Sequence, residues 1–390
     1  MSRERGRRAA AAFAVSSEMR GPVPGRIVSG MPSSVPAAAP PSLETSDVLL
    51  AAGVSKPVFS CPWPETRRLA RELWADLPNG LEARLYDEPY LGGQDTLHLE
   101  FLDAWLDWRE PVVGLDLAAL PWRYATMGST EAIRESLALH AMAGTRTGRR
   151  PTIHVFAGEY EGYAAEGEGY GIHVVRHDRR AYEESLLAHA APGDRLYVSH
   201  PSAIDGSVWA GFPGLVEFVE ARLPGVRLMV DLTYVGTVGT SYSVELRSPV
   251  VHTVFFSLSK VFGVYYHRVG GALSREPLTG LYGNRWFKNT FSLEFGRRLL
   301  RSLDVYTLPR RYAALQARAV AAVAARLGAP CVASDVVLLA HHAWEAGLPP
   351  EVAPLRRGDA VRYCLTPALD RLLHDPRGDA RAPAHGAPLP

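Results

Sequence analysis

The apolar run Val250-Val-His-Thr-Val-Phe-Phe256 leads directly into Ser257-Leu-Ser-Lys-Val-Phe-Gly-Val-Tyr-Tyr-His-Arg268. A short apolar run of this kind predicts a buried strand. Lys260 therefore lies just past a strand end, with serines before it and Arg268 eight residues after it. This pattern suits a lysine that forms a Schiff base with a carbonyl cofactor, while the hydroxyls and the guanidinium bind the cofactor's phosphate. Taken alone, the motif describes a surface lysine in a turn equally well.

A carboxylate follows an earlier strand-like segment. Val226-Arg-Leu-Met-Val-Asp231 is typical of a buried strand that ends in an acid, and Leu-Thr-Tyr234 comes next. About 26 residues separate Tyr234 from Lys260, which is enough for a crossover between parallel strands. A carboxylate at this point can keep a pyridine nitrogen protonated. The alternative is an ordinary aspartate that caps a turn.

The segment Thr126-Met-Gly-Ser-Thr-Glu-Ala-Ile133 opens a helical pattern in which apolar residues recur every four positions. Ser129 or Thr130 is the expected N-cap, with Glu131 in the first turn. The free N–H groups of such a helix start bind anions readily. A capped helix without a ligand is the alternative.

Taken in order, these segments resemble class I/II aminotransferases, which are fold-type I pyridoxal-5′-phosphate (PLP) enzymes, from about Tyr86 to Arg362. The resemblance implies that Lys260 forms the Schiff base. It also implies that Asp231 bonds the pyridine nitrogen and that Tyr234 bonds the cofactor's 3′-oxygen. Further residues are implied to bind the cofactor's phosphate: Gly128, Ser129, Thr130, Ser257 and Arg268.

The resemblance extends to the ring and substrate positions. Tyr160 aligns best with the aromatic residue that stacks on the pyridine, whereas Tyr163 is an alternative that could fill the core. Arg362, on a strand expected within 359–366, is implied to hold the substrate's α-carboxylate. Arg356 and Arg357 are expected to be solvated loop residues.

The resemblance also implies a homodimer. Tyr86 corresponds to a tyrosine that reaches the phosphate of the partner subunit, and Tyr90 is the alternative.

One family feature is missing. The family carries Asn-Pro-x-Gly after a central strand, and the corresponding stretch here is Ser199-His-Pro-Ser-Ala-Ile-Asp-Gly206. Ala203 stands where the asparagine would bond the 3′-oxygen. Ser202, Asp205 or His200 is expected to replace it, and the sequence leaves this choice open.

Strand-like and helical segments alternate, which predicts an α/β fold. We expect a mostly parallel sheet of the seven-stranded type in a large domain and a small C-terminal α/β domain. The expected strands are 153–156, 172–175, 196–199, 226–231, 250–256 and 269–273, and the expected helices are 130–143, 181–190 and 212–223. The expected layout is a disordered leader at 1–45, a segment at 46–95 that joins the small domain, a large domain at 96–289, the small domain at 290–375 and a disordered tail at 376–390.

Composition excludes several classes of protein. The 42 basic and 41 acidic residues give a net charge of +1, so no footprint for nucleic acid is present. The 3 cysteines are widely spaced, which argues against a disulfide framework and a zinc cluster, and no metal site is expected. No apolar run is long enough to span a membrane. A cytoplasmic location is expected.

These features favour an enzyme that acts on an amino acid. Arg362 would hold the carboxylate, Lys260 would remove the α-proton, and a quinonoid intermediate would follow. An aminotransferase is the leading hypothesis, and the alternative is γ-replacement, elimination or cyclisation in a bacterial secondary-metabolite pathway. An inactive PLP-fold regulator is the non-enzyme alternative, although it would be expected to lose Lys260 or Asp231. A nucleotide-binding protein would need a glycine-rich phosphate loop, which we do not find.

Overall fold

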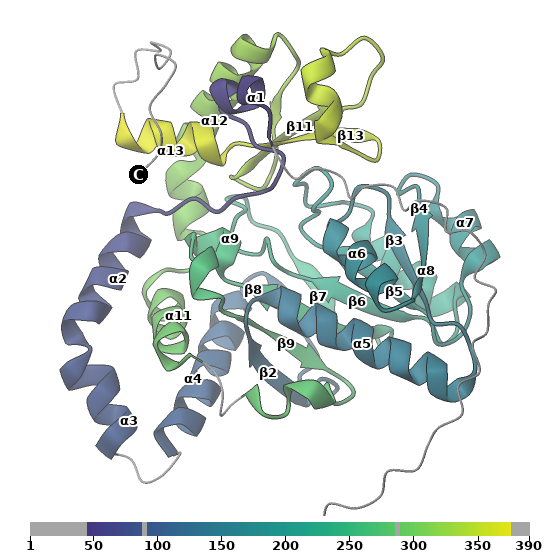
Figure 1. Cartoon of the computed structure of the whole chain (residues 1–390), viewed down its shortest axis with the longest axis horizontal. Coiled ribbons are helices and arrows are strands. Elements are labelled where there is room, and N and C mark those ends of the chain that lie inside the picture. The colour runs from purple at the N-terminus through teal and green to yellow at the C-terminus, as the bar shows by residue number, and fades with distance from the viewer. Residues whose placement is uncertain (1–44, 88–91, 285–288, 376–390) are drawn as a thin grey trace, which may run out of the picture. The chain divides into compact units, whose positions relative to one another are not determined.

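The computed structural model describes residues 45–87, 92–284 and 289–375 (Figure 1). A seven-stranded sheet has the strand order β2-β9-β8-β6-β5-β3-β4. Neighbouring strands run parallel, except that β9 is antiparallel to both β2 and β8. The strands are β2 (Trp122–Thr126), β3 (Thr152–Phe156), β4 (His173–His177), β5 (Arg195–Ser199), β6 (Arg227–Asp231), β8 (Val251–Ser257) and β9 (Gly270–Ser274).

Helices cover both faces of this sheet, which is why its central strands are apolar throughout. One face packs against α5 (Ser129–Thr147) and α6 (Glu161–Gly169) through residues that include Tyr197, Met229 and Phe255. The other face belongs to the larger core, which includes residues of α8 (Phe212–Arg222) and α4 (Gly92–Arg109). Helix α7 (Tyr182–His189) links β4 to β5. The alternation of strand and helix therefore predicted the sheet correctly, although it missed β2 and α6.

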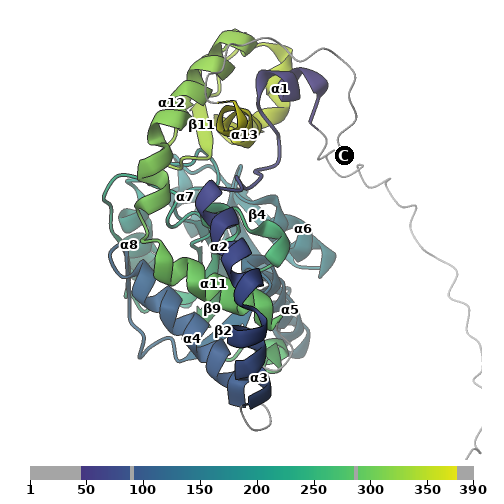
Figure 2. The same cartoon turned by 90° about the vertical axis from the view of Figure 1, so that its left-hand side faces the viewer.

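A second sheet lies in the C-terminal part of the chain. Its four antiparallel strands have the order β10-β11-β13-β12, and their bounds are β10 (Val332–Ala333), β11 (Leu339–Ala343), β12 (Arg356–Arg357) and β13 (Ala360–Cys364). Figure 2 shows α12 (Thr307–Leu327), α13 (Thr366–His374) and the early helix α1 (Asp47–Ala52) grouped around it. Arg371 of α13 donates a hydrogen bond of 3.0 Å to the carbonyl of Ala51.

The remaining elements complete the scaffold. Helix α2 (Pro64–Asp76) lies beside α11 (Thr290–Ser302), and α11 in turn packs against α4 (Figure 2). The shorter elements are a π-helical turn (Pro78–Glu82), α3 (Ala83–Asp87), the parallel pair β1 (Val113–Leu115) and β7 (Val244–Leu246), α9 (Ser259–Phe262), and 3₁₀ turns at Tyr265–His267, Thr279–Leu281 and Pro350–Leu355.

The carboxyl ends of the central parallel strands meet at one edge of the large sheet. Asp231, the last residue of β6, is in register with Ser199 on β5 and with Phe255 on β8. The turn between β12 and β13 packs on this edge: a Cβ on Gly158 would lie 2.6 Å from the carbonyl carbon of Arg357. This edge is where ligands bind in open α/β sheets.

Some expectations fall outside the described residues. The leader up to residue 44 and the tail at 376–390 lie there, as does Tyr90. Among the residues that are described, no helix is both long and apolar enough to cross a membrane. The same residues contain no cluster of three or more side chains suited to hold a metal ion.

Buried neutral histidines make the fold sensitive to acid. Burial lowers the pKa of His140 on α5 to about 4, and its Nε2 lies 2.9 Å from the carbonyl of Thr152. In the unfolded chain His140 binds a proton as the pH falls below ~6.5, whereas in the folded chain it stays neutral until about pH 4. The free energy of unfolding therefore falls as the pH falls from ~6.5 to about 4. Between pH 7.5 and pH 5.5, we expect the His140→Gln variant to lose about 1 kcal/mol less of its free energy of unfolding than the wild-type protein loses. Denaturant unfolding at pH 7.5 and 5.5 measures this, with exposed His173→Gln as the control. An equal effect of the two variants would contradict the assignment.

Candidate functional site

A cavity of about 410 Å³ lies at the carboxyl edge of the large sheet. All of the site residues predicted from the sequence line it, apart from Gly128 and Tyr86. They come from widely separated parts of the chain and are Lys260, Asp231, Tyr234, Ser129, Thr130, Tyr160, Ser257, Arg268 and Arg362. The segment 56–60, which sequence reasoning did not consider, also forms part of the wall.

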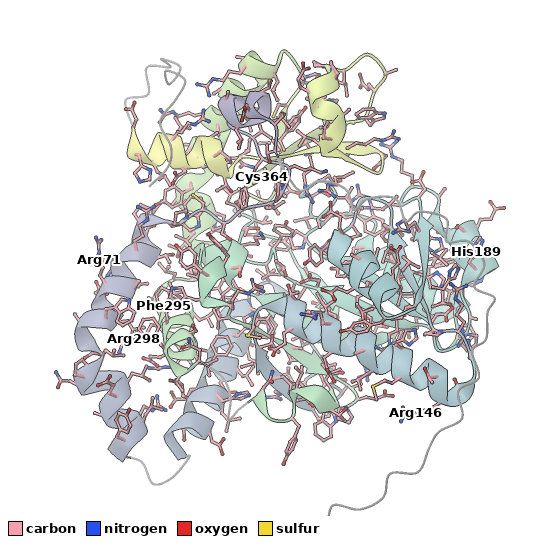
Figure 3. The ribbon with its side chains drawn as sticks, in the orientation of Figure 1. Arg71, Arg146, His189, Phe295, Arg298 and Cys364 are labelled. Atoms are coloured by element: carbon pink, nitrogen blue, oxygen red, sulfur yellow. The ribbon has the colours of Figure 1, made fainter. Side chains whose placement is uncertain are left out.

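Lys260 lies on α9, immediately past the end of β8. Its Nζ donates a hydrogen bond to the carbonyl of Val58 in the 56–60 segment. That segment is tied to β13, because the amide of Phe59 donates to Sγ of Cys364 at 3.3 Å (Cys364 is labelled in Figure 3). Burial lowers the pKa of Lys260 to about 8, so an appreciable fraction of the amine is neutral near physiological pH.

Asp231 ends β6 inside the cavity wall. Its carboxylate accepts hydrogen bonds from the amide of Thr233 at 3.0 Å, from Oγ1 of Thr233 at 2.5 Å and from the hydroxyl of Tyr163 at 3.1 Å. Burial raises the pKa of Asp231 to about 6, while these hydrogen bonds act in the opposite direction. The donors therefore help to keep a buried carboxylate ionised at neutral pH.

Tyr163 has a role that sequence reasoning missed. The sequence suggested a core-filling residue, and the ring is indeed buried at 1% exposure, but its hydroxyl supports Asp231. Its ring also meets the Tyr160 ring edge-on, with 5.3 Å between centroids. Tyr160 and Tyr163 stand three residues apart at the start of α6, and this spacing is the sequence signal for two neighbouring rings on one helix face.

The other end of the cavity is suited to an anion. Gly128 precedes α5 with φ of 73°, and a Cβ there would lie 3.1 Å from Nη2 of Arg268 and 3.4 Å from Oγ of Ser257. The N-cap is Gly128, so the expected cap at Ser129 or Thr130 is wrong. Oγ of Ser129 instead lies 3.0 Å from Oγ1 of Thr233. A helix N-terminus, hydroxyls and a guanidinium converge here, as an anion requires.

Two arginines of the smaller sheet line the cavity. Arg362 on β13 is 5% exposed and donates to the carbonyl of Ala203, while its Nε has no hydrogen-bond partner within the described residues. Arg357 lines the cavity at 7% exposure and forms an ion pair with Glu161. The expected solvated loop position of Arg357 is therefore wrong, because the β12–β13 turn packs on the sheet edge. Arg356 is exposed and lies over Trp344.

The substituted position Ala203 is part of the cavity wall. The three side chains expected to replace an asparagine there do not line the cavity. Ser202 accepts a hydrogen bond of 3.0 Å from Arg179, Asp205 pairs with the same arginine, and His200 stacks on Phe212 with 4.3 Å between ring centroids. Those interactions hold the turn and leave the missing bond unsupplied.

Two predicted tyrosines differ in their surroundings. Tyr234 is buried and lines the cavity, and burial raises the pKa of its hydroxyl. Tyr86 on α3 is 84% exposed and does not line the cavity. Its expected role across a subunit interface stays a prediction.

No family model matches the chain, and no curated protein matches it by sequence. Solved structures do match its fold. The methionine aminotransferase YbdL of Escherichia coli has a TM-score of 0.61 at 14% identity, and the match covers 88% of this chain and 100% of that one. For a mutant aspartate aminotransferase of Thermus thermophilus the TM-score is 0.59 at 14% identity, with 84% and 97% covered. The histidinol-phosphate aminotransferase of Sinorhizobium meliloti, solved with PLP, has a TM-score of 0.54 at 14% identity, with 82% and 90% covered.

The chain has the aminotransferase fold. The fold predicted from the sequence, that of the fold-type I enzymes, is thereby confirmed. At these identities the likeness concerns the fold, and the chemistry of the cavity must be argued from its own residues.

Tyr163→Phe tests the support of Asp231. Loss of the hydroxyl donor should raise the pKa of Asp231 above about 6, by about one further unit. Carbon-13 NMR of aspartate-labelled protein measures the titration. Tyr197→Phe is the matched control, because this buried tyrosine bonds Ser136 at 2.9 Å rather than Asp231. An unchanged midpoint in Tyr163→Phe would contradict the role given to its hydroxyl.

Proposed function

We propose that this chain is a PLP-dependent aminotransferase that acts on an amino acid. The observation that carries the proposal is the pairing, in one cavity, of an amine with a lowered pKa on Lys260 and a buried, hydrogen-bonded carboxylate on Asp231. An anion cradle at Gly128, Ser257 and Arg268 completes the set.

The cavity residues fit PLP in three respects. Gly128 has a positive φ that favours glycine, and a Cβ there would occupy the space beside Nη2 of Arg268, at 3.1 Å, where we propose that the phosphate binds. Ser129, Thr130 and Ser257 line the same end and offer hydroxyl donors. Tyr160, at 39% exposure, presents a ring to the cavity, where it would stack on the cofactor. We therefore propose that these residues, with Tyr234, hold PLP.

When bound, PLP supplies an electron sink for the bond-breaking step, and it depends on a protonated ring nitrogen. Asp231 would keep that proton in place, since its carboxylate stays ionised beside Thr233 and Tyr163. Lys260 Nζ would first hold the cofactor and then, once released, take the α-proton from the substrate. Arg362 would orient the substrate through its α-carboxylate, which would also bond the Nε of Arg362, for which the described part of the chain supplies no partner.

Arg357 and Glu161 belong to the same end of the cavity as Arg362. Their ion pair lines the cavity together with Arg362, so we propose that the pair influences which amino-acid side chains are accepted. The side chain of Glu161 is 46% exposed, so it can move away from Arg357 without breaking a buried contact of its own.

Ala203 favours a second candidate function. An asparagine at this position would stabilise the deprotonated 3′-oxygen, and its absence changes the electronics of the bound cofactor. A specialised reaction, such as γ-replacement, elimination or cyclisation in a bacterial secondary-metabolite pathway, would fit such a change. An inactive regulator is disfavoured because Lys260 and Asp231 are both present.

We also propose a homodimer and a cytoplasmic location. Four tyrosine side chains are exposed, and the first of them also lines the cavity, namely Tyr265, Tyr266, Tyr282 and Tyr86. A second copy of the chain would cover such a surface. The three cysteines are all unbridged, which suits a reducing compartment.

Absorption and labelling test the central proposal. The purified protein should absorb at about 410–430 nm, and borohydride should fix the cofactor to the peptide that contains Lys260. Donor amino acids with 2-oxoglutarate or pyruvate then separate the two reactions. Rapid amino-group transfer supports the aminotransferase, whereas α-hydrogen exchange without transfer supports the specialised reaction. Labelling of a different lysine would refute the site.

Arg268→Ala tests the anion cradle. Loss of a charge-assisted bond to phosphate should weaken PLP binding by about tenfold or more, while turnover at saturating PLP changes less. Fluorescence titration of the apoprotein with PLP measures the affinity. Arg356→Ala, which removes an exposed guanidinium outside the cavity, is the control and should leave PLP affinity unchanged. Unchanged affinity with collapsed turnover would instead move Arg268 to the substrate site.

A further inference from the structure

A hydroxyl group stands in the cavity wall between Asp231 and the substituted Ala203. Ser199 ends β5, is in register with Asp231 on β6, and lines the cavity at 3% exposure. Its Oγ accepts a hydrogen bond of 2.7 Å from the amide of Ala203. Ser199 is thus hydrogen-bonded to the backbone of Ala203, the residue that stands where the side-chain amide of an asparagine was expected.

Glu159 lies directly behind this serine. It does not line the cavity and is 5% exposed. Its Oε2 accepts a hydrogen bond of 2.6 Å from Oγ of Ser199, and its Oε1 accepts one of 3.1 Å from the amide of Ser199. The amide of Tyr160 is a further donor at 3.3 Å. All of these partners are uncharged donors, which favour the ionised form of Glu159 but bring no positive charge to it.

The groups that face Glu159 also disfavour its charge. Burial raises the pKa of Glu159 to about 7, and the carboxylate of Asp231 on β6 raises it as well, whereas the bonds from Ser199 and Tyr160 lower it. Tyr160 and Tyr163 are the titratable neighbours on its own segment. Two basic residues lie on neighbouring segments, and each has another partner. Arg357, on the β12–β13 turn, forms an ion pair with Glu161, and the ring of His200, which follows β5, stacks on Phe212.

The proton on Glu159 decides where the serine hydroxyl points. The hydroxyl of Ser199 donates to an ionised Glu159. When Glu159 is protonated this bond can reverse, so that the carboxyl O–H donates to Oγ of Ser199, which already accepts the amide of Ala203. Both lone pairs are then used, so the serine's own proton is free to point into the cavity. When Glu159 is ionised, the serine proton turns toward the carboxylate and the cavity faces only an acceptor.

We propose that Ser199, backed by a protonated Glu159, donates to the 3′-oxygen of bound PLP the hydrogen bond that an asparagine at position 203 would otherwise supply. Ser199 then contacts the cofactor, and Glu159 is a positioning residue that acts through it. The inference rests on the proposed function, and it explains how a chain with alanine at this position keeps a donor there. Ser202, Asp205 and His200 are engaged elsewhere and lie outside the cavity lining.

The cofactor's own absorption tests the proposal without measuring activity. A donor favours the deprotonated 3′-oxygen, so Ser199→Ala should raise the midpoint of the pH-dependent change in the visible spectrum by about one pH unit. Adding Ala203→Asn to this variant should restore the midpoint, because the amide replaces the lost donor. Ser199→Thr, which keeps a hydroxyl, should retain the wild-type midpoint. Ser274→Ala is the control, since it removes an equally buried hydroxyl that bonds Thr253.

Glu159→Gln tests the positioning role. The glutamine amide donates to Ser199 at every pH, so the serine proton stays directed into the cavity. Between pH 6 and 8 the PLP affinity of the wild-type protein should fall relative to that of Glu159→Gln, because Glu159 ionises near pH 7 only in the wild type while Lys260 titrates in both proteins. Fluorescence titration with PLP at pH 6 and 8 measures the difference and does not require turnover.

The outcomes separate this inference from the proposed function. If the wild-type protein binds no PLP, the proposed function fails. If it binds PLP but neither Ser199→Ala nor Glu159→Gln changes the spectral midpoint or the pH dependence of affinity, only the present inference is overturned. Lower thermal stability in both variants with unchanged spectra would mean that the pair is purely structural. If the Ser199→Ala variant does not bind PLP, the inference is tested by the spectral midpoint of Ser199→Thr and by the pH dependence of PLP affinity in Glu159→Gln.

Discussion

Burial of the Asp231 carboxylate is the constraint on which the rest of the cavity depends. A carboxylate away from water stays ionised only if donors and opposite charge surround it. Thr233 supplies two of the donors, Tyr163 supplies the third from α6, and the amine of Lys260 lowers the pKa from across the cavity. The amine in turn has a lowered pKa, because the same burial disfavours its charge. The acid and the base are therefore adjusted by one environment.

Close backbone contacts at particular glycines bring the parts of the site together. Gly128 lets α5 begin beside Arg268 and Ser257, and Gly158 lets the β12–β13 turn settle on the edge of the large sheet. A Cβ on Gly158 would lie 2.6 Å from the backbone of Arg357 and would push the β12–β13 turn away from the sheet edge. The turn carries Arg357, and the adjoining strand carries Arg362. The positions of the anion cradle and of the arginines at the substrate end thus depend on close packing around these two glycines.

Residues 199–206 keep their backbone hydrogen bonds although alanine stands at position 203 instead of asparagine. With alanine at 203, the backbone of that residue still makes two bonds, one from its amide to Ser199 and one from its carbonyl to Arg362. The polar side chains of the turn are used to hold its shape through Arg179. The chemistry that an asparagine side chain would supply must then come from a neighbouring strand end, and Glu159 with Ser199 is the buried polar pair at that point.

The sequence by itself determined six of the seven strands of the large sheet and the helices α5, α7 and α8, because apolar runs and helical periodicity are local signals, but it missed β2 and α6. It also determined which residues stand at strand ends, including Asp231 and Lys260, since parallel strands present their carboxyl ends at a common edge. Only the tertiary structure decided that Tyr163 supports Asp231, that Arg357 is buried in the cavity rather than solvated, and that Gly128 is the cap of α5. These outcomes depend on contacts between segments far apart in the chain. Residue spacing carries no record of such contacts, so composition and periodicity could not have revealed them.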